Sequence, residues 1–283
     1  MTFPAFSIGA AARRPLLLLT RANAPRFAAA AGQDPPAPPS QPARPRLSDQ
    51  PKIVARHELG HLISFIANGD KKLAISLKSD EVLKGSVTPE KRPLTARNYW
   101  NHVVSCIAGL IFTCNNRLYE CLKDKNESAP LLCTAGNDIR LMRKFLEKGC
   151  KAGLFTLTDI DLSPLPLERY IDIVKGSLSG KEDIAFINRY VEDLTATVKH
   201  PIIQMAAKTA GDLFNAIPPE TLEAMTAECV AKRRISQDEM PAFIERHLPL
   251  RLRAKLKLIM RRSETEALRQ LAPPSASIPP KNL

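Results

Sequence analysis

The sequence predicts a predominantly α-helical α+β fold: a helix that carries an HExxH motif, a small β-sheet or hairpin, and then a helical bundle. Apolar residues recur at helical spacing over most of the chain after residue 48. Only the segments 73–77 and 85–88 have the composition and length of strands. The longest apolar run is shorter than the roughly 18 residues that a membrane-spanning helix requires, so a soluble protein is expected.

Residues 1–47 are rich in Ala, Pro and Arg and are predicted to be disordered, because such a segment cannot bury enough apolar surface to offset its chain entropy. The part before Asp34 has four Arg and no acidic residue, a composition found in organellar transit peptides and in bacterial export segments. An address signal and a plain disordered tail both fit. The sequence therefore leaves the compartment open between cytoplasm, organelle and secretion.

The first helix is expected to run from Ser48 to a turn at Gly69. Ser48 can cap its N-terminus, and Pro51 suits its first turn. The two strands, 73–77 and 85–88, follow this helix. The first strand could offer an edge along which an extended peptide lies, or could simply close the sheet.

Helices are expected over the rest of the folded part of the chain. Thr95 is predicted to open a long apolar helix, and Asn137 a second helix that ends near Lys148. Further helices are expected at 167–175, 182–214, 219–232 and 237–247. Together with the first helix and the strands, they are predicted to form one domain over residues 48–248.

The formal net charge of +12 is concentrated toward the two ends of the chain. Residues 249–283 are predicted to form a basic helix and a tail, because six basic and no acidic residues lie between Leu250 and Arg262. This helix could rest on an anionic membrane, dock on an acidic partner, or remain solvated. Aromatic residues make up only 5% of the chain, so we expect no nucleic-acid partner. Six cysteines without CxxC pairing favour a reduced compartment.

The segment His57-Glu58-Leu59-Gly60-His61 fits the HExxH pattern and falls inside the first predicted helix. Residues four apart on a helix lie one turn apart on the same face, so both imidazoles can reach one Zn²⁺ ion. Glu58 lies one position on, close enough to act as a general base on a water molecule without binding the metal. In the alternative, His57 and His61 are partly exposed helix residues without a metal and Glu58 is solvated, but the apolar flanks favour the burial of all three.

Two imidazoles do not complete a catalytic zinc site, which commonly has three protein ligands. The extended HExxHxxGxxH pattern is absent, because Ser64 and Ala67 occupy the positions of its Gly and third His. A carboxylate is therefore expected to complete the site. Asp138, at the start of its helix, and Glu120 are the candidates.

Four segments of this chain match a known pattern: HELGH at 57–61, the strand with Gly85, the Ala108-Gly109 step, and Asp138 at the start of a helix. In these features the stretch 53–145 resembles the peptidase domain of the FtsH-type ATP-dependent zinc metalloproteases, and the resemblance extends more thinly over about residues 50–248. The resemblance implies a zinc metallopeptidase-like domain. It also implies that Asp138 is the third zinc ligand beside His57 and His61, with Glu58 as the catalytic residue.

The chain also departs from that family. The AAA ATPase module has no counterpart, since the segment 176–181 has the wrong spacing for a P-loop. Leu110 stands where the family has Arg, and Asn115 and Asn116 replace an acidic pair.

From these features we expect a stand-alone, ATP-independent zinc endopeptidase that acts on flexible or unfolded protein segments, and that can form homo-oligomers. Two rival readings remain open at this point. One is a non-catalytic adaptor or regulator that retains the fold, and the other is a secreted effector protease whose N-terminal segment is an export signal.

Overall fold

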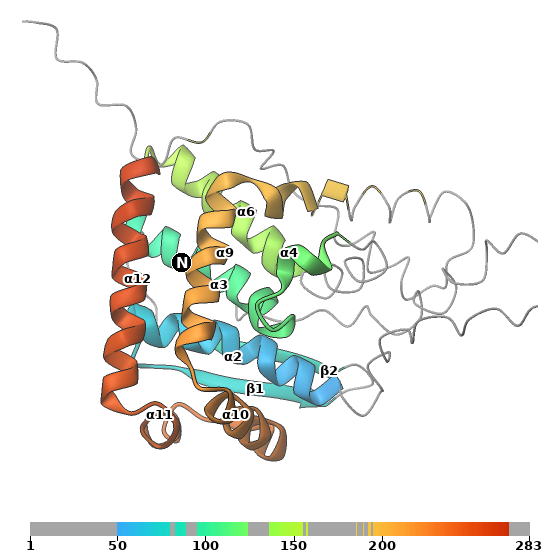
Figure 1. Cartoon of the computed structure of the whole chain (residues 1–283), viewed down its shortest axis with the longest axis vertical. Helices are drawn as coiled ribbons and strands as arrows, with labels where there is room; N and C mark the ends of the chain where they lie inside the picture. The colour runs from blue at the N-terminus through green and yellow to red at the C-terminus, as the bar shows by residue number, and fades with distance from the viewer. Residues whose placement is uncertain are drawn as a thin grey trace, which may run out of the picture.

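The computed structural model describes residues 50–79, 83–88, 95–123, 136–154 and 195–271, together with residues 157, 185, 189, 192 and 193. Most of the described residues are helical, and the strands form one three-stranded sheet, of which Figure 1 labels β1 and β2. The predicted predominantly α-helical α+β class is therefore confirmed. The predicted disordered segment 1–47 and the predicted helix 167–175 lie outside the described residues.

The elements follow one another along the chain as α2 (Gln50–Asn68), β1 (Ala74–Ser79), β2 (Leu83–Thr88), α3 (Ala96–Thr113), α4 (Leu118–Cys121), α6 (Gly136–Lys151), α9 (Pro201–Ala216), α10 (Pro219–Lys232), β3 (Arg234–Ile235), α11 (Met240–His247) and α12 (Leu250–Leu271). Helix α3 lies at the centre and packs against α2, α6, α9 and α12. Every residue of α3 from Tyr99 to Phe112 is buried, as expected of a helix that is apolar on all sides.

The ends of α2 and α3 are set by local sequence. Thr95 caps α3, because its side-chain oxygen accepts a hydrogen bond from the backbone N–H of Asn98 at 3.2 Å. Gly69 ends α2 with a φ of 86°, and the backbone N–H of Asp70 donates to the carbonyl of Phe65 at 3.0 Å. This is the left-handed helix end that glycine permits. Both boundaries agree with the sequence prediction.

The sheet has the strand order β2-β1-β3 and packs against α2. In its antiparallel register, Ile75 pairs with Val87 on one side and with Ile235 on the other. These three side chains are buried and form the face of the sheet that turns toward the core. The strand predicted at 73–77 is thus the middle strand and closes the sheet, and β2 is an outer strand.

Two of the predicted boundaries differ from the structure by more than a few residues. The predicted helix 182–214 is interrupted at His200, and α9 begins at Pro201. Proline lacks a backbone N–H and cannot continue a helix through its own position, and His200 caps the new helix by accepting from the N–H of Ile202 at 3.3 Å. The helix that the sequence places beyond the domain, α12, packs against α2, α3 and α9.

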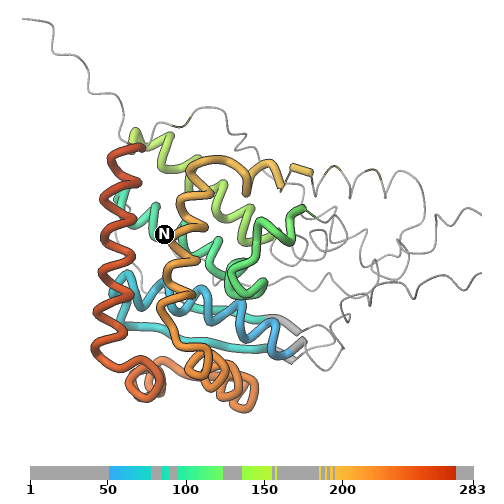
Figure 2. Tube along the Cα trace, in the orientation of Figure 1, coloured from blue at the N-terminus to red at the C-terminus, as the bar shows by residue number. Residues whose placement is uncertain are grey.

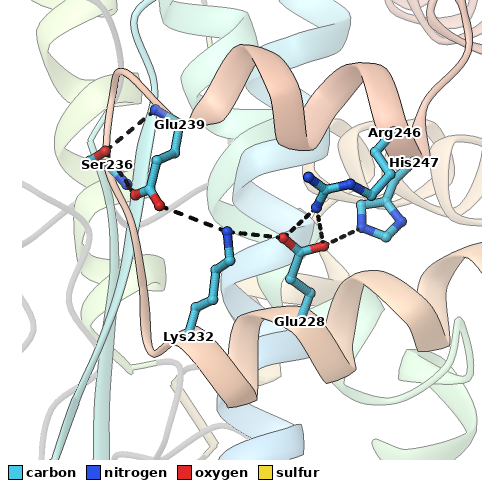
Figure 3. A network of polar contacts seen from close by, with 6 residues as sticks. All are labelled: Glu228, Lys232, Ser236, Glu239, Arg246 and His247. Carbon is cyan, nitrogen blue, oxygen red and sulfur yellow. Dashed lines mark hydrogen bonds and ion pairs between the residues drawn. The ribbon is translucent and has the colours of Figure 1, made fainter.

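A polar network holds α10 against α11 (Figure 3). The Glu228 carboxylate accepts from Arg246 at 2.6 Å and from Lys232 at 3.3 Å, and it contacts His247 at 2.8 Å. Burial alone would raise the pKa of Glu228, but these donors outweigh it and lower that pKa to about 2. Helix α10 in turn packs against α2. By fixing α10, the network helps to hold α2 in place.

In the part of the chain that the structure describes, no helix has both the length and the apolar composition needed to cross a bilayer.

Candidate metal centre

The HExxH segment lies in the buried middle of α2. His57 is 2% exposed, and Glu58 and His61 are 0% exposed. Burial of three ionisable side chains on one helix is costly unless they are paired or hold an ion. The alternative predicted that these three side chains would be exposed to solvent, and the structure shows that they are buried.

Two glycines let α2 and α3 approach closely enough to form the site. A Cβ at Gly60 would lie 2.4 Å from the carbonyl oxygen of Ala108 on α3. A Cβ at Gly109 would lie 2.6 Å from Nε2 of His57 and 2.9 Å from Nε2 of His61. Any side chain at either position would force the helices apart or displace the imidazoles.

The structure brings His57, His61 and Asp138 together. Oδ2 of Asp138, in the first turn of α6, lies 2.7 Å from Nε2 of His57 and 3.6 Å from Nε2 of His61. One ligand atom from each of the three residues lies within 4.8 Å of the other two, and all three side chains are buried. The other candidate carboxylate, Glu120 on α4, is exposed and pairs with Arg117 at 3.4 Å.

The hydrogen bonds behind the imidazoles fix which nitrogen faces the centre. Nδ1 of His61 lies 2.8 Å from the carbonyl oxygen of Ser105, which can only accept, so Nδ1 carries the proton. Nδ1 of His57 lies 3.1 Å from Oγ1 of Thr113, whose own hydroxyl donates to the carbonyl of Gly109 at 2.8 Å. Thr113 therefore accepts from His57. Both imidazoles therefore turn Nε2 toward Asp138, which is the orientation of metal-binding histidines.

The electrostatics of the group centre on the ionised carboxylate of Asp138. Burial alone would raise the pKa of Asp138, but the two histidines outweigh it and lower that pKa, so the carboxylate stays ionised. Burial alone would lower the pKa of His61, but Asp138, Glu58 and the Ser105 carbonyl outweigh it and raise that pKa to about 9. For His57, burial prevails over Asp138 and lowers the pKa.

Glu58 lies beside this group and does not belong to it. Neither of its carboxylate oxygens has a hydrogen-bond partner among the described residues. Burial raises the pKa of Glu58 to about 8, with His61 opposing the rise and Asp138 adding to it. Gly85 of β2 covers this side chain so closely that a Cβ at Gly85 would lie 2.4 Å from Oε1.

Two groups that hydrogen-bond to the imidazoles were not predicted from the sequence. Thr113 and the carbonyl of Ser105 orient the imidazoles, yet a threonine near a helix end and a backbone carbonyl carry no sequence signal of that role. The remaining histidines serve elsewhere: His102 stacks on Phe145 with ring centroids 4.6 Å apart, and His200 caps α9.

The departures from the FtsH-type pattern have structural explanations. Leu110 is a fully buried core residue of α3. Asn115 and Asn116 adopt φ values of 51° and 61° in the turn after α3, a left-handed backbone conformation that asparagine adopts more readily than most residues.

No protein-family model matches the chain, and no curated protein matches it. The resemblance to the FtsH-type peptidases stays a prediction that depends on the segments quoted above.

Proposed function

We propose that this protein is a zinc-dependent endopeptidase that hydrolyses peptide bonds in flexible or unfolded protein segments. The observation that carries the proposal is the convergence of three buried lone-pair donors, Nε2 of His57, Nε2 of His61 and Oδ2 of Asp138. The imidazoles use Nδ1 to donate to Thr113 and Ser105, so Nε2 of each faces the Asp138 carboxylate, where a shared proton or a metal ion can join them.

The donor set fits Zn²⁺. Two imidazole nitrogens and one carboxylate oxygen, with one position left open, form a common catalytic zinc shell. Ligand bonds of about 2.0–2.1 Å in a tetrahedron place neighbouring ligand atoms roughly 3.3 Å apart. The distances of 2.7 Å and 3.6 Å from Oδ2 of Asp138 to the two imidazoles lie on either side of that value. A bound zinc ion would supply a Lewis acid that polarises a peptide carbonyl and lowers the pKa of water.

Glu58 is proposed as the general base. Its two carboxylate oxygens have no hydrogen-bond partner among the described residues, so they are free to bind a water molecule. The carboxylate would take a proton from that water as the water attacks the carbonyl, and would pass the proton to the leaving amine. Burial raises the pKa of Glu58 in the metal-free site, and a bound zinc ion would lower it again toward the ionised form that a general base needs.

The outer strand β2 is proposed as the place where an extended substrate lies. Within the described part of the sheet, β2 pairs only with β1, so its other edge is open to an added strand. Gly85 on this strand is in contact with Glu58, so a peptide bound along β2 would pass next to the base.

A second function, a metal-stabilised protein that does not catalyse, is favoured by one observation. Glu58 is 0% exposed, and Gly85 packs directly on it. Such closure suits a structural ion. The two functions differ in what they require of Glu58, since only catalysis needs its proton transfer.

The test measures zinc content and hydrolysis of unfolded casein for the full-length wild-type protein and three variants. We expect about one zinc per chain and hydrolysis in the wild type, and loss of both in Asp138→Ala. Glu58→Gln should keep the zinc and lose about 10²- to 10⁴-fold in rate. The control Glu120→Gln changes the exposed candidate carboxylate and should alter neither quantity.

Equal rates in the wild type and Glu58→Gln would contradict the peptidase proposal and leave the non-catalytic metal protein. A wild-type protein that binds no zinc would contradict both.

A further inference from the structure

The exposed face of α12 carries a concentration of positive charge. Five side chains on this face are exposed, namely Arg251, Lys255, Lys257, Arg261 and Arg262. No acidic residue occurs between Leu250 and Ser263 to balance them within the helix. None of the five forms an ion pair with a carboxylate of the described residues, whereas Arg269, near the end of the same helix, pairs with Glu266 at 2.9 Å.

Two leucines stand on the exposed side of α12. Leu250 is 74% exposed and Leu258 is 49% exposed. Among the described residues, the only other large apolar side chain counted as exposed is Tyr119, at 37%. Large apolar side chains set among cations are typical of helices that lie in the interface of an anionic membrane.

The opposite side of α12 is fixed in the folded body. Leu256 and Met260 are buried where the helix packs against α2 and α9. Its position is also held by Glu264, which accepts from Asn101 at 2.9 Å and pairs with Arg97 at 2.9 Å. Figures 1 and 2 show α12 as a straight helix along one side of the molecule. The helix is therefore already formed and fixed in the folded protein, and its cationic face is exposed to solvent.

A groove of about 510 Å³ between α9 and α12 adjoins this face. Lys255 and Arg262 line it from α12. Two acids also line it, but Asp212 pairs with Lys208 at 4.0 Å and Glu266 pairs with Arg269. The two unpaired cations leave the groove with a positive balance, which suits a phosphate group.

We propose that α12 docks this protein on an anionic phospholipid surface. The five cations would face the head groups, and Leu250 and Leu258 would enter the interface. An acidic polypeptide is disfavoured by the two exposed leucines, because it would pair with the cations and leave these apolar side chains in water. A lipid surface adapts to a convex face and takes up protruding leucines.

The test is co-sedimentation of the full-length protein with vesicles of phosphatidylcholine alone and of phosphatidylcholine mixed with phosphatidylserine. Binding is expected only to the mixed vesicles and should weaken as salt is raised. The double variant Lys257→Glu and Arg261→Glu should bind at least 25-fold more weakly, because each lost cation is worth about fivefold. Leu258→Ser should weaken binding severalfold without changing the net charge.

The matched control is Lys144→Glu with Lys148→Glu, which makes the same change in net charge at two exposed lysines of α6. Circular dichroism and the melting temperature show whether each variant is folded. Three results would overturn the proposal: no preference for phosphatidylserine, equal loss of binding in both double variants, or unchanged binding when α12 is altered. Polyglutamate that displaces the protein from vesicles and binds it as tightly would assign the face to an acidic polypeptide instead.

Discussion

The hydroxyl of Thr113 accepts a hydrogen bond from Nδ1 of His57 at 3.1 Å and so turns the other ring nitrogen toward Asp138. This contact joins the end of α3 to the middle of α2. It determines which nitrogen of His57 is available as a lone-pair donor.

Thr113→Val should weaken zinc binding by about 10- to 100-fold, because the imidazole loses the partner that fixes its tautomer and orientation. Valine keeps the shape of the side chain, so the fold should be retained. Zinc affinity is measured by competition with a chromophoric chelator. The matched control is Thr226→Val on α10, a buried threonine whose hydroxyl donates to the carbonyl of Leu222 at 2.7 Å. Equal affinity in Thr113→Val and wild type would contradict the role of Thr113.

Gly60→Ala should destabilise the protein by roughly 1 to 3 kcal/mol, because the added methyl overpacks the contact with the Ala108 carbonyl on α3. Zinc affinity should fall with it, since the same contact sets the distance from α2 to α3. Urea unfolding gives the first quantity and chelator competition the second. Gly69→Ala is the comparison: its Cβ would meet open space, so it should cost about 1 kcal/mol from its positive φ and leave zinc affinity unchanged. A loss of zinc affinity in Gly69→Ala, with unchanged affinity in Gly60→Ala, would refute this account.

Zinc should raise the melting temperature of the wild-type protein, because a ligand that binds only the folded state stabilises it. At a free zinc concentration about 100 times the Kd, the gain is about 2.7 kcal/mol. Chelation should reverse the gain, and Asp138→Ala should show little of it. Glu58→Gln, which keeps the three donors, should respond as the wild type does. A gain of the same size in Asp138→Ala would show that the ion binds elsewhere.

The network around Glu228 should stabilise the fold at neutral pH and stop doing so in acid. The folded pKa of Glu228 is lowered from 4.5 to about 2. A carboxylate with a lowered folded pKa contributes its stability above the unfolded pKa and loses it as the pH falls toward the folded pKa. The difference in unfolding free energy between wild type and Glu228→Gln should therefore be roughly 1 to 2 kcal/mol at pH 7.

That difference should vanish between about pH 4.5 and pH 2, the two pKa values of Glu228. Urea unfolding of both proteins across this range is the measurement. The comparison variant is Glu220→Gln, which alters an exposed carboxylate in the first turn of α10. A difference that stays constant through the acid range would show that Glu228 acts by shape and not by charge.

Much of the fold was predictable because local chemistry determined it. The apolar spacing of α2, the cap at Thr95 and the turn at Gly69 depend on residues close in sequence. The break before Pro201 also had a local signal, the proline itself, which the helical spacing on both sides obscured. Strand β3 has two residues, too few for an alternating pattern to show.

The site was predictable only in part from the residues themselves. Helical geometry places His57 and His61 on one face, so that pair follows from spacing alone. The third donor depends on how α6 packs, and spacing could not decide between Asp138 and Glu120; the family resemblance favoured Asp138. The packing of α12 could not be predicted from its composition, because a helix with this many basic residues also fits a solvated or membrane-bound position; Leu256 and Met260 are buried in the structure.

The histidine pair and Asp138 stand on different helices, and α3 packs against both of them. A growing chain can therefore offer an incoming ion two donors from α2 as soon as that helix forms, but the carboxylate arrives only once α3 and α6 have docked. All three donors therefore meet only in the folded protein, and the binding free energy of an ion held there would add to the stability of the fold.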